Sequence, residues 1–148
     1  MSAILFLLLA LAAGACLPTQ AGINTQLNQW ARSPVLTAAI SFAVGTASLA
    51  FYALVSRIPL PPISAISKYP AWIWAGGCFG AFFVASCVVL APRLGAATMV
   101  ALIVTGQMTA GVLLDHFGLI GYDTHPLNLW RMVGVALMVG GVVLVRWF

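Results

Sequence analysis

The sequence contains very few charged residues. Glutamate is absent, Asp115 and Asp123 are the only acidic residues, and charged residues make up 5% of 148 positions. A water-soluble domain of this size needs many more, because about a quarter of the residues in an average soluble domain are charged. Hydrophobic residues instead make up 63% of the chain. This composition excludes an ordinary soluble domain and predicts an integral membrane protein surrounded by a lipid bilayer.

The sequence also lacks the clusters that mark several other functional classes. The net charge of +4 comes from scattered Lys and Arg without a basic run, so we expect no nucleic-acid surface. The three cysteines lie in apolar runs and are expected to be small packing residues, not a disulfide framework. They are Cys16, Cys78 and Cys87. His116, His125 and Asp123 do not have the spacing of helical metal ligands, so we expect no metal and no cofactor. No nucleophile–base set is present, and enzymatic activity is not expected.

Five long apolar segments are separated by short connections. A membrane-spanning helix needs about 20 mostly apolar residues. The predicted helices cover residues 3–30, 35–55, 71–90, 94–114 and 129–147. No connection is long enough to hold another domain. The sequence therefore predicts an all-α polytopic membrane protein with five transmembrane helices in a single transmembrane domain, residues 1–148.

The connections carry the residues that end helices. Ser33 followed by Pro34 is typical of an N-cap and the first helical position. The prolines between positions 59 and 62 are expected to end the second helix and to keep the chain extended up to Pro70. Pro92 and Gly95 are expected to separate the third and fourth helices.

Positive charge is balanced across the predicted membrane. With five spans, one side holds Arg57, Lys68 and Arg131, and the other holds Arg32, Arg93 and Arg146. Orientation follows mainly the Lys and Arg bias of short loops, so an equal tally predicts insertion both ways up. Two opposite copies could pair as an antiparallel homodimer with a substrate site near the midplane, as in inverted-repeat transporters. The alternative is that a partner chain or a weak bias fixes one orientation.

Several uncharged polar residues lie at membrane depth. Gln20 and Asn24 share one face of the first helix, Ser41 belongs to a stripe of small residues on the second, and Gln107 lies near the middle of the fourth. Such groups are costly in hydrocarbon unless they face protein or water. They are therefore predicted to face inward and to bind a substrate, although hydrogen bonding between helices explains them equally well.

One carboxylate and two sets of glycines complete the candidate residues. Asp115, near the end of the fourth helix, is a candidate substrate-binding or coupling carboxylate, but its position favours a solvated helix-end charge. A GxxxG pair predicts close packing of the third helix, and further glycines predict packing or dimer contacts of the fifth helix. These residues are Gly76, Gly80, Gly134, Gly140 and Gly141.

Short motifs are distributed along nearly the whole chain. They are Gln20–Leu27, Ser41–Thr46, Trp72–Gly77, Pro92–Gly95, Gly106–Gln107 and Asp115–Gly118. In this order they resemble the YdcZ-like family of the drug/metabolite transporter superfamily. The resemblance implies a five-helix, half-size version of a ten-helix inverted-repeat transporter. It also implies a bacterial inner membrane location and export of a small solute.

The chain differs from the small multidrug resistance proteins of the same superfamily, which use a membrane-embedded Glu to exchange protons for cationic drugs. This sequence has no Glu, and both Asp residues are predicted near a surface. Gln and Asn side chains form hydrogen bonds but carry no proton. We therefore expect a neutral or zwitterionic substrate, or uncoupled passage, by alternating access in the dimer. The alternatives are a non-transporting assembly or accessory subunit and a small dual-topology channel.

Overall fold

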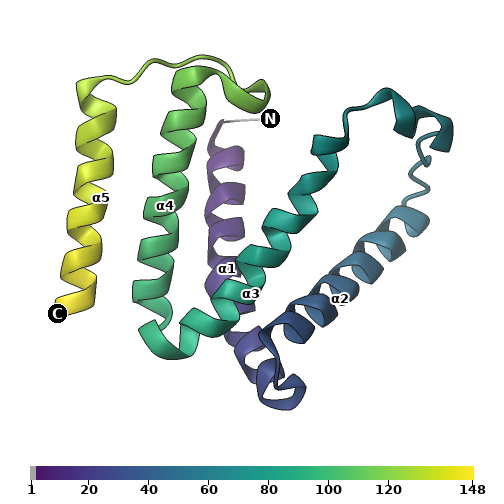
Figure 1. The fold of residues 1–148 in the computed structure, drawn as a ribbon, viewed down its shortest axis with the longest axis horizontal. Coiled ribbons are helices and arrows are strands. Elements are labelled where there is room, and N and C mark those ends of the chain that lie inside the picture. Colours follow the sequence, from purple (N-terminus) through teal and green to yellow (C-terminus); the bar gives the residue numbers. More distant parts are fainter. Residues whose placement is uncertain (1–2) are drawn as a thin grey trace. The chain divides into compact units, whose positions relative to one another are not determined.

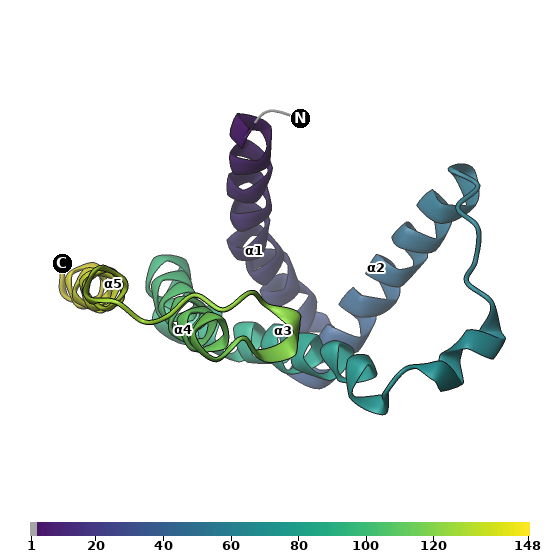
Figure 2. The same cartoon turned by 90° about the horizontal axis from the view of Figure 1, so that it is seen from above.

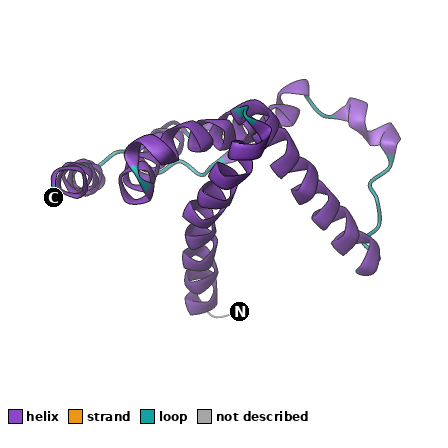
Figure 3. Cartoon of the chain, turned by 90° about the horizontal axis from the view of Figure 1, so that it is seen from below, coloured by secondary structure: helices purple, strands orange, loops and turns teal. Residues whose placement is uncertain are grey.

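The computed structural model describes residues 3–148, apart from the side chains at positions 63, 65 and 67, and its regular elements are helices (Figures 1 and 3). The long helices are α1 (Ala3–Ala31), α2 (Pro34–Val55), α3 (Gly76–Leu94), α4 (Ala96–Phe117) and α5 (Leu129–Trp147). Three short 3₁₀ helices are η1 (Ile63–Lys68), η2 (Ala71–Ala75) and η3 (Leu119–Gly121). Within residues 3–148, five helical segments are long and apolar enough to cross a membrane, which confirms the predicted all-α fold.

Two connections differ from the prediction. The chain before Pro70 is not extended throughout, because η1 forms between Pro62 and Pro70, where no proline interrupts it. Pro92 does not end the third helix, since α3 continues to Leu94. A proline there costs a hydrogen bond of the last turns but does not stop the helix. Gly95 alone separates α3 from α4, with a φ of 76° that favours glycine.

The chain divides into two compact units, and α1 contributes to both. The first unit contains residues 1–18 and 93–148 and is called the α4–α5 unit. The second contains residues 19–92 and is called the α2–α3 unit. Pro18 lies at the division, but α1 remains helical through it.

In the α4–α5 unit, α4 and α5 lie side by side (Figures 1 and 2). Gly118 ends α4 in the left-handed region with a φ of 59°, and its N–H donates to the carbonyl groups of the last turn. Asn128 begins α5, because its side-chain oxygen accepts a hydrogen bond from the Arg131 N–H at 2.9 Å. The connection between the two helices is therefore fastened at both ends.

In the α2–α3 unit, the second half of α1 and the start of α2 form a tight hairpin. Arg32 and Ser33 are its only non-helical residues. Ser33 Oγ accepts from the Leu36 N–H at 3.3 Å, and Pro34 is the first helical residue, which confirms the predicted cap. Across the hairpin, Thr37 Oγ1 donates to Asn28 Oδ1 at 3.1 Å. Thr37 is 0% exposed and Asn28 is half-buried, so the bond is partly shielded from the surroundings of the protein.

The interior of this unit is made by the end of α1, the start of α2 and the second half of α3. The buried residues are Ala21, Asn24, Thr37, Ala38, Val84, Cys87 and Val88. Cys87 fits the predicted packing role, whereas Cys16 and Cys78 are exposed and do not. A Cβ added at Gly80 would lie 3.1 Å from Phe42 Cζ, so this glycine gives the α2 ring room. No such neighbour surrounds Gly76, where the described residues leave open space.

Candidate functional site

A cavity of about 220 Å³ lies between α1 and α2 in the α2–α3 unit. It is lined by Gln20, Ser41, Phe42, Gly45, Thr46 and Leu49. One amide and two hydroxyl groups therefore share a small space with an aromatic and an aliphatic side chain. The lining contains no charged residue.

The cavity lies well inside the predicted membrane. Gln20 precedes the end of α1 at Ala31 by 11 residues, which at 1.5 Å per residue is about 16 Å. Ser41 follows the start of α2 at Pro34 by seven residues, or about 10 Å. The hydrocarbon core of a bilayer is about 30 Å thick, so these polar groups reach towards its middle.

The chemistry of the cavity suits uncharged hydrogen-bonding groups. The amide of Gln20 donates and accepts, and the hydroxyl groups of Ser41 and Thr46 do both. None of these side chains exchanges a proton at ordinary pH. The volume is below the range of about 300–1,000 Å³ that is typical of complete ligand pockets. The cavity can therefore hold part of a small polar solute.

The structure brings two of the predicted residues together, because Gln20 and Ser41 line the same cavity. Asn24, one turn from Gln20, is only 4% exposed and is not part of the lining. The sequence analysis missed Thr46 and the apolar walls. The signal was present, since Phe42 and Thr46 are four residues apart, directly beside the stripe that contains Ser41.

Gln107 belongs to the other unit and is exposed on α4. It follows Ala96 by 11 residues and precedes Phe117 by ten, so it lies about 15–16 Å from either end. The nearby Thr109 hydroxyl is also exposed but donates to the Thr105 carbonyl in its own helix at 2.8 Å. Gln107 thus has an exposed polar side chain near the middle of the membrane-spanning helix α4.

Asp115 takes part in a set of contacts that fastens the α4–α5 connection. Its carboxylate lies 3.2 Å from Arg131 Nη1, and both side chains are 30% exposed. Arg131 Nη1 also donates to the His125 carbonyl at 3.2 Å, while the His125 N–H donates to the Asp115 carbonyl at 2.8 Å. These contacts favour the helix-end interpretation of Asp115, and its role in substrate binding stays a prediction.

The histidines near this connection are also held by backbone contacts. His116 Nδ1 accepts from the Leu127 N–H at 3.0 Å, which leaves the proton of a neutral ring on Nε2. His125 Nδ1 lies 3.0 Å from the Asp123 carbonyl. Within the described part of the chain, no three His, Cys, Asp or Glu side chains come together as metal ligands would.

The glycines of α5 are open within the chain. A Cβ added at Gly134, Gly140 or Gly141 would meet no described atom within 4 Å. Within the α4–α5 unit, no described atom therefore approaches these glycines closely. Their predicted role in dimer contacts stays a prediction.

The positive charges lie where the five spans begin and end. The connections or terminal helical turns hold Arg32, Arg57, Lys68, Arg93, Arg131 and Arg146. Residues 5–144 match the family described as "Putative inner membrane exporter, YdcZ". The chain belongs to this family. It is accordingly a multi-pass inner membrane protein, and the resemblance seen in its motifs is confirmed. No curated protein and no solved structure gives a significant match to this member of the YdcZ family.

Proposed function

We propose that the chain exports a small neutral or zwitterionic solute and works as an antiparallel homodimer by alternating access. Membership of the YdcZ family supports the export of a solute across the inner membrane. The dimer, the mixed orientation and the nature of the solute are inferred from the residues described above. The proposal also assigns the chain no enzymatic activity.

The exposed amide of Gln107 is the observation that carries the proposal. An amide without a hydrogen-bond partner in an apolar medium costs roughly 2–7 kcal/mol. Gln107 lies at the centre of α4, where lipid tails would offer it no partner. Polar groups at this depth face protein, water or a substrate. A second copy that covers this face of α4 would enclose Gln107 and remove the cost.

The cavity beside Gln20 supports the same arrangement. Its volume of about 220 Å³ is small for a complete site. Two copies related by an axis in the membrane plane would each bring one such cavity, as the two halves of inverted-repeat transporters do. Ser41 would complete the polar lining, and Asn24 would support Gln20 from one turn away. The glycines of α5 would allow close contacts between copies.

The balance of positive charge supports dual topology. If all five helices cross the membrane, the α1–α2 and α3–α4 connections and the end of α5 share one side, and they hold Arg32, Arg93 and Arg146. The α2–α3 and α4–α5 connections lie on the other side. They hold Arg57, Lys68 and the first-turn Arg131. A tally of three against three gives the insertion machinery no preference.

Counterflow in proteoliposomes tests transport directly. A panel of radiolabelled amino acids and sugars is offered as neutral and zwitterionic solutes. We expect saturable counterflow of at least one of them, and Gln107→Leu should abolish it while the purified dimer keeps its size and helix content. Gln29→Leu, an exposed amide near the end of α1, is the matched control and should keep its flux. Flux that does not saturate indicates a channel. The absence of flux across the panel supports an accessory subunit, and unchanged flux in Gln107→Leu removes this residue from the site.

Reporters on both termini test the orientation in cells. We expect the unmodified chain to show both orientations. The double variant Arg57→Gln with Lys68→Gln leaves one cation against three and should give a single orientation. As a matched control, Arg57→Gln with Arg32→Gln keeps the balance at two against two and should stay mixed. A single orientation of the unmodified chain contradicts the antiparallel dimer.

A further inference from the structure

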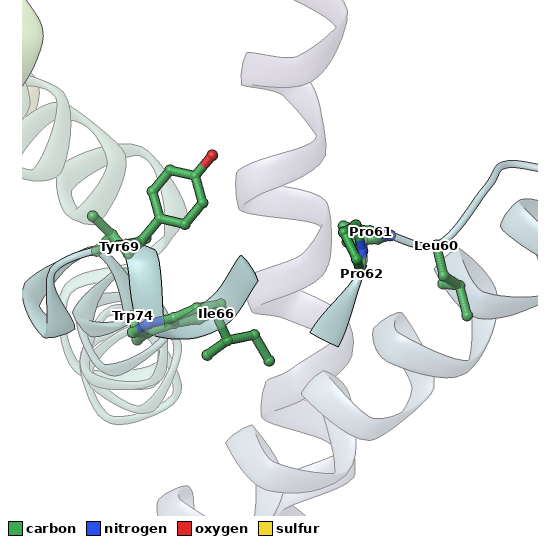
Figure 4. A pocket seen from close by; sticks show the side chains of 7 residues that line it. Leu60, Pro61, Pro62, Ile66, Tyr69 and Trp74 are labelled. Atoms are coloured by element: carbon green, nitrogen blue, oxygen red, sulfur yellow. The ribbon is translucent and has the colours of Figure 1, made fainter. Parts of the chain in front are cut away.

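The connection between α2 and α3 forms an apolar groove. Its volume is about 440 Å³, within the range of about 300–1,000 Å³ for small-molecule pockets. One side is formed by Leu60, Pro61 and Pro62, and the other by Ile66, Tyr69 and Trp74 (Figure 4). The groove lies entirely within the α2–α3 unit.

The groove lies at the level of a membrane surface. It starts at Leu60, shortly after the span Pro34–Val55, and ends at Trp74, in the first turn of the span Ala71–Leu94. Tyr69 and Trp74 in its wall are the aromatic types that concentrate at the boundary between headgroups and acyl chains. An apolar groove at this boundary opens where acyl chains are available at high concentration.

Two cations without acidic partners accompany the groove. Arg57 precedes Leu60 by three residues, and Lys68 directly precedes Tyr69. Residues 56–75 contain no Asp or Glu, and among the described residues neither cation lies within 4 Å of a carboxylate. Arg131 differs, because Asp115 neutralises it at 3.2 Å. The chain segment that forms the groove therefore also carries two positive charges without an acidic partner.

We propose that this groove binds an anionic phospholipid, with an acyl chain against Tyr69 and Trp74 and the phosphate near Arg57 and Lys68. Basic residues at a membrane surface attract anionic headgroups, which supplies the charge complementarity. A second copy of the chain fits the groove less well than an anionic phospholipid, because it would need acidic residues to neutralise Arg57 and Lys68. Its two acidic residues are Asp115, which is already paired, and Asp123.

Quenching of Trp74 fluorescence by brominated lipids tests the proposal. In a variant that keeps Trp74 and has Phe at the other Trp positions, brominated phosphatidylglycerol should quench more strongly than brominated phosphatidylcholine at equal mole fraction. A matched variant that keeps Trp130, next to the neutralised Arg131, should be quenched equally by both lipids. Circular dichroism establishes that each variant is folded. Because both leaflets contain the lipid, the result depends neither on orientation nor on transport.

Charge variants in the Trp74 background identify the headgroup contacts. Each cation near an anionic surface contributes about fivefold to lipid association, so Lys68→Gln should lower the preference for phosphatidylglycerol by about fivefold. Arg57→Gln should act similarly, and the matched control Arg93→Gln should leave the preference unchanged. Equal quenching of Trp74 by both lipids overturns the proposal. An equal loss of the preference for phosphatidylglycerol in Arg93→Gln also overturns it. Protection of Trp74 from both brominated lipids overturns it as well, because it would indicate that protein covers the groove.

Discussion

Replacing Gly118 by alanine should destabilise the connection between α4 and α5 more than the same change at Gly121. Both glycines have positive φ, 59° at Gly118 and 86° at Gly121. An L-residue in the left-handed region costs about 1–2 kcal/mol. At Gly121, a Cβ would meet no described atom within 4 Å, so only this backbone cost applies.

At Gly118, the added Cβ would lie 2.6 Å from Thr124 Oγ1, which is too close for two such atoms. The Thr124 side chain must therefore leave its rotamer, and a strained χ angle costs about 0.5–1.5 kcal/mol. The expected total for Gly118→Ala is about 1.5–3.5 kcal/mol. The double variant Gly118→Ala with Thr124→Ala should return to the level of Gly121→Ala, because the hydroxyl that causes the overlap is gone.

The free energy of unfolding can be measured by circular dichroism while dodecyl sulfate is added to protein in mild detergent micelles. Thr124→Ala alone corrects for any stability that the hydroxyl itself contributes. Equal free energies of unfolding for Gly118→Ala and Gly121→Ala would contradict the predicted overlap between the added Cβ and Thr124 Oγ1. The overlap would also be contradicted if adding Thr124→Ala to Gly118→Ala does not raise the free energy of unfolding.

Three further predictions concern the helix ends. Ser33→Ala should lower the free energy of unfolding by about 1 kcal/mol in the same assay, and Ser33→Asp should restore most of it, since the cap accepts from a backbone N–H. A double-mutant cycle of Asn28→Leu and Thr37→Val should give a coupling energy of about 1 kcal/mol, and additive effects would exclude the 3.1 Å bond. Asp115→Asn should cost at most about 1 kcal/mol, because its ion pair with Arg131 is partly exposed, and Asp115→Asn with Arg131→Gln should cost little more. Abolished counterflow with unchanged stability in Asp115→Asn would instead assign this carboxylate to transport.

The helices could be predicted from the sequence because they depend on local composition. Each span is a long apolar run, and Ser33 with Pro34 supplies both the cap and the first residue of α2. The predicted fold and family follow from these local signals. The short η1 helix was missed because prolines on both sides suggested an extended chain, and the continuation of α3 past Pro92 was missed because proline usually ends a helix.

The candidate site could be predicted only in part, because a cavity depends on how two helices meet. Periodicity placed Gln20 on a face of α1 and Ser41 on a face of α2, but nothing in the sequence required these faces to share a cavity with Thr46. The hydrogen bond between Asn28 and Thr37, nine residues apart, likewise depends on the geometry of the hairpin and has no signal in the sequence. For Gln107, the sequence gives the depth on α4 but not which atoms surround the amide.

The hairpin between α1 and α2 also bears on how the protein is made. Its turn is only Arg32 and Ser33, so the two helices must enter the bilayer as one inserted piece. To reverse the orientation of the hairpin, Arg32 would have to pass through the hydrocarbon core. An arginine at the membrane centre costs about 2.5–3.5 kcal/mol on insertion scales, and both helices would have to cross the membrane with it. The orientation of each copy is therefore expected to be fixed during synthesis. In the dual-topology dimer that we propose, copies of opposite orientation would then meet by diffusion in the membrane plane.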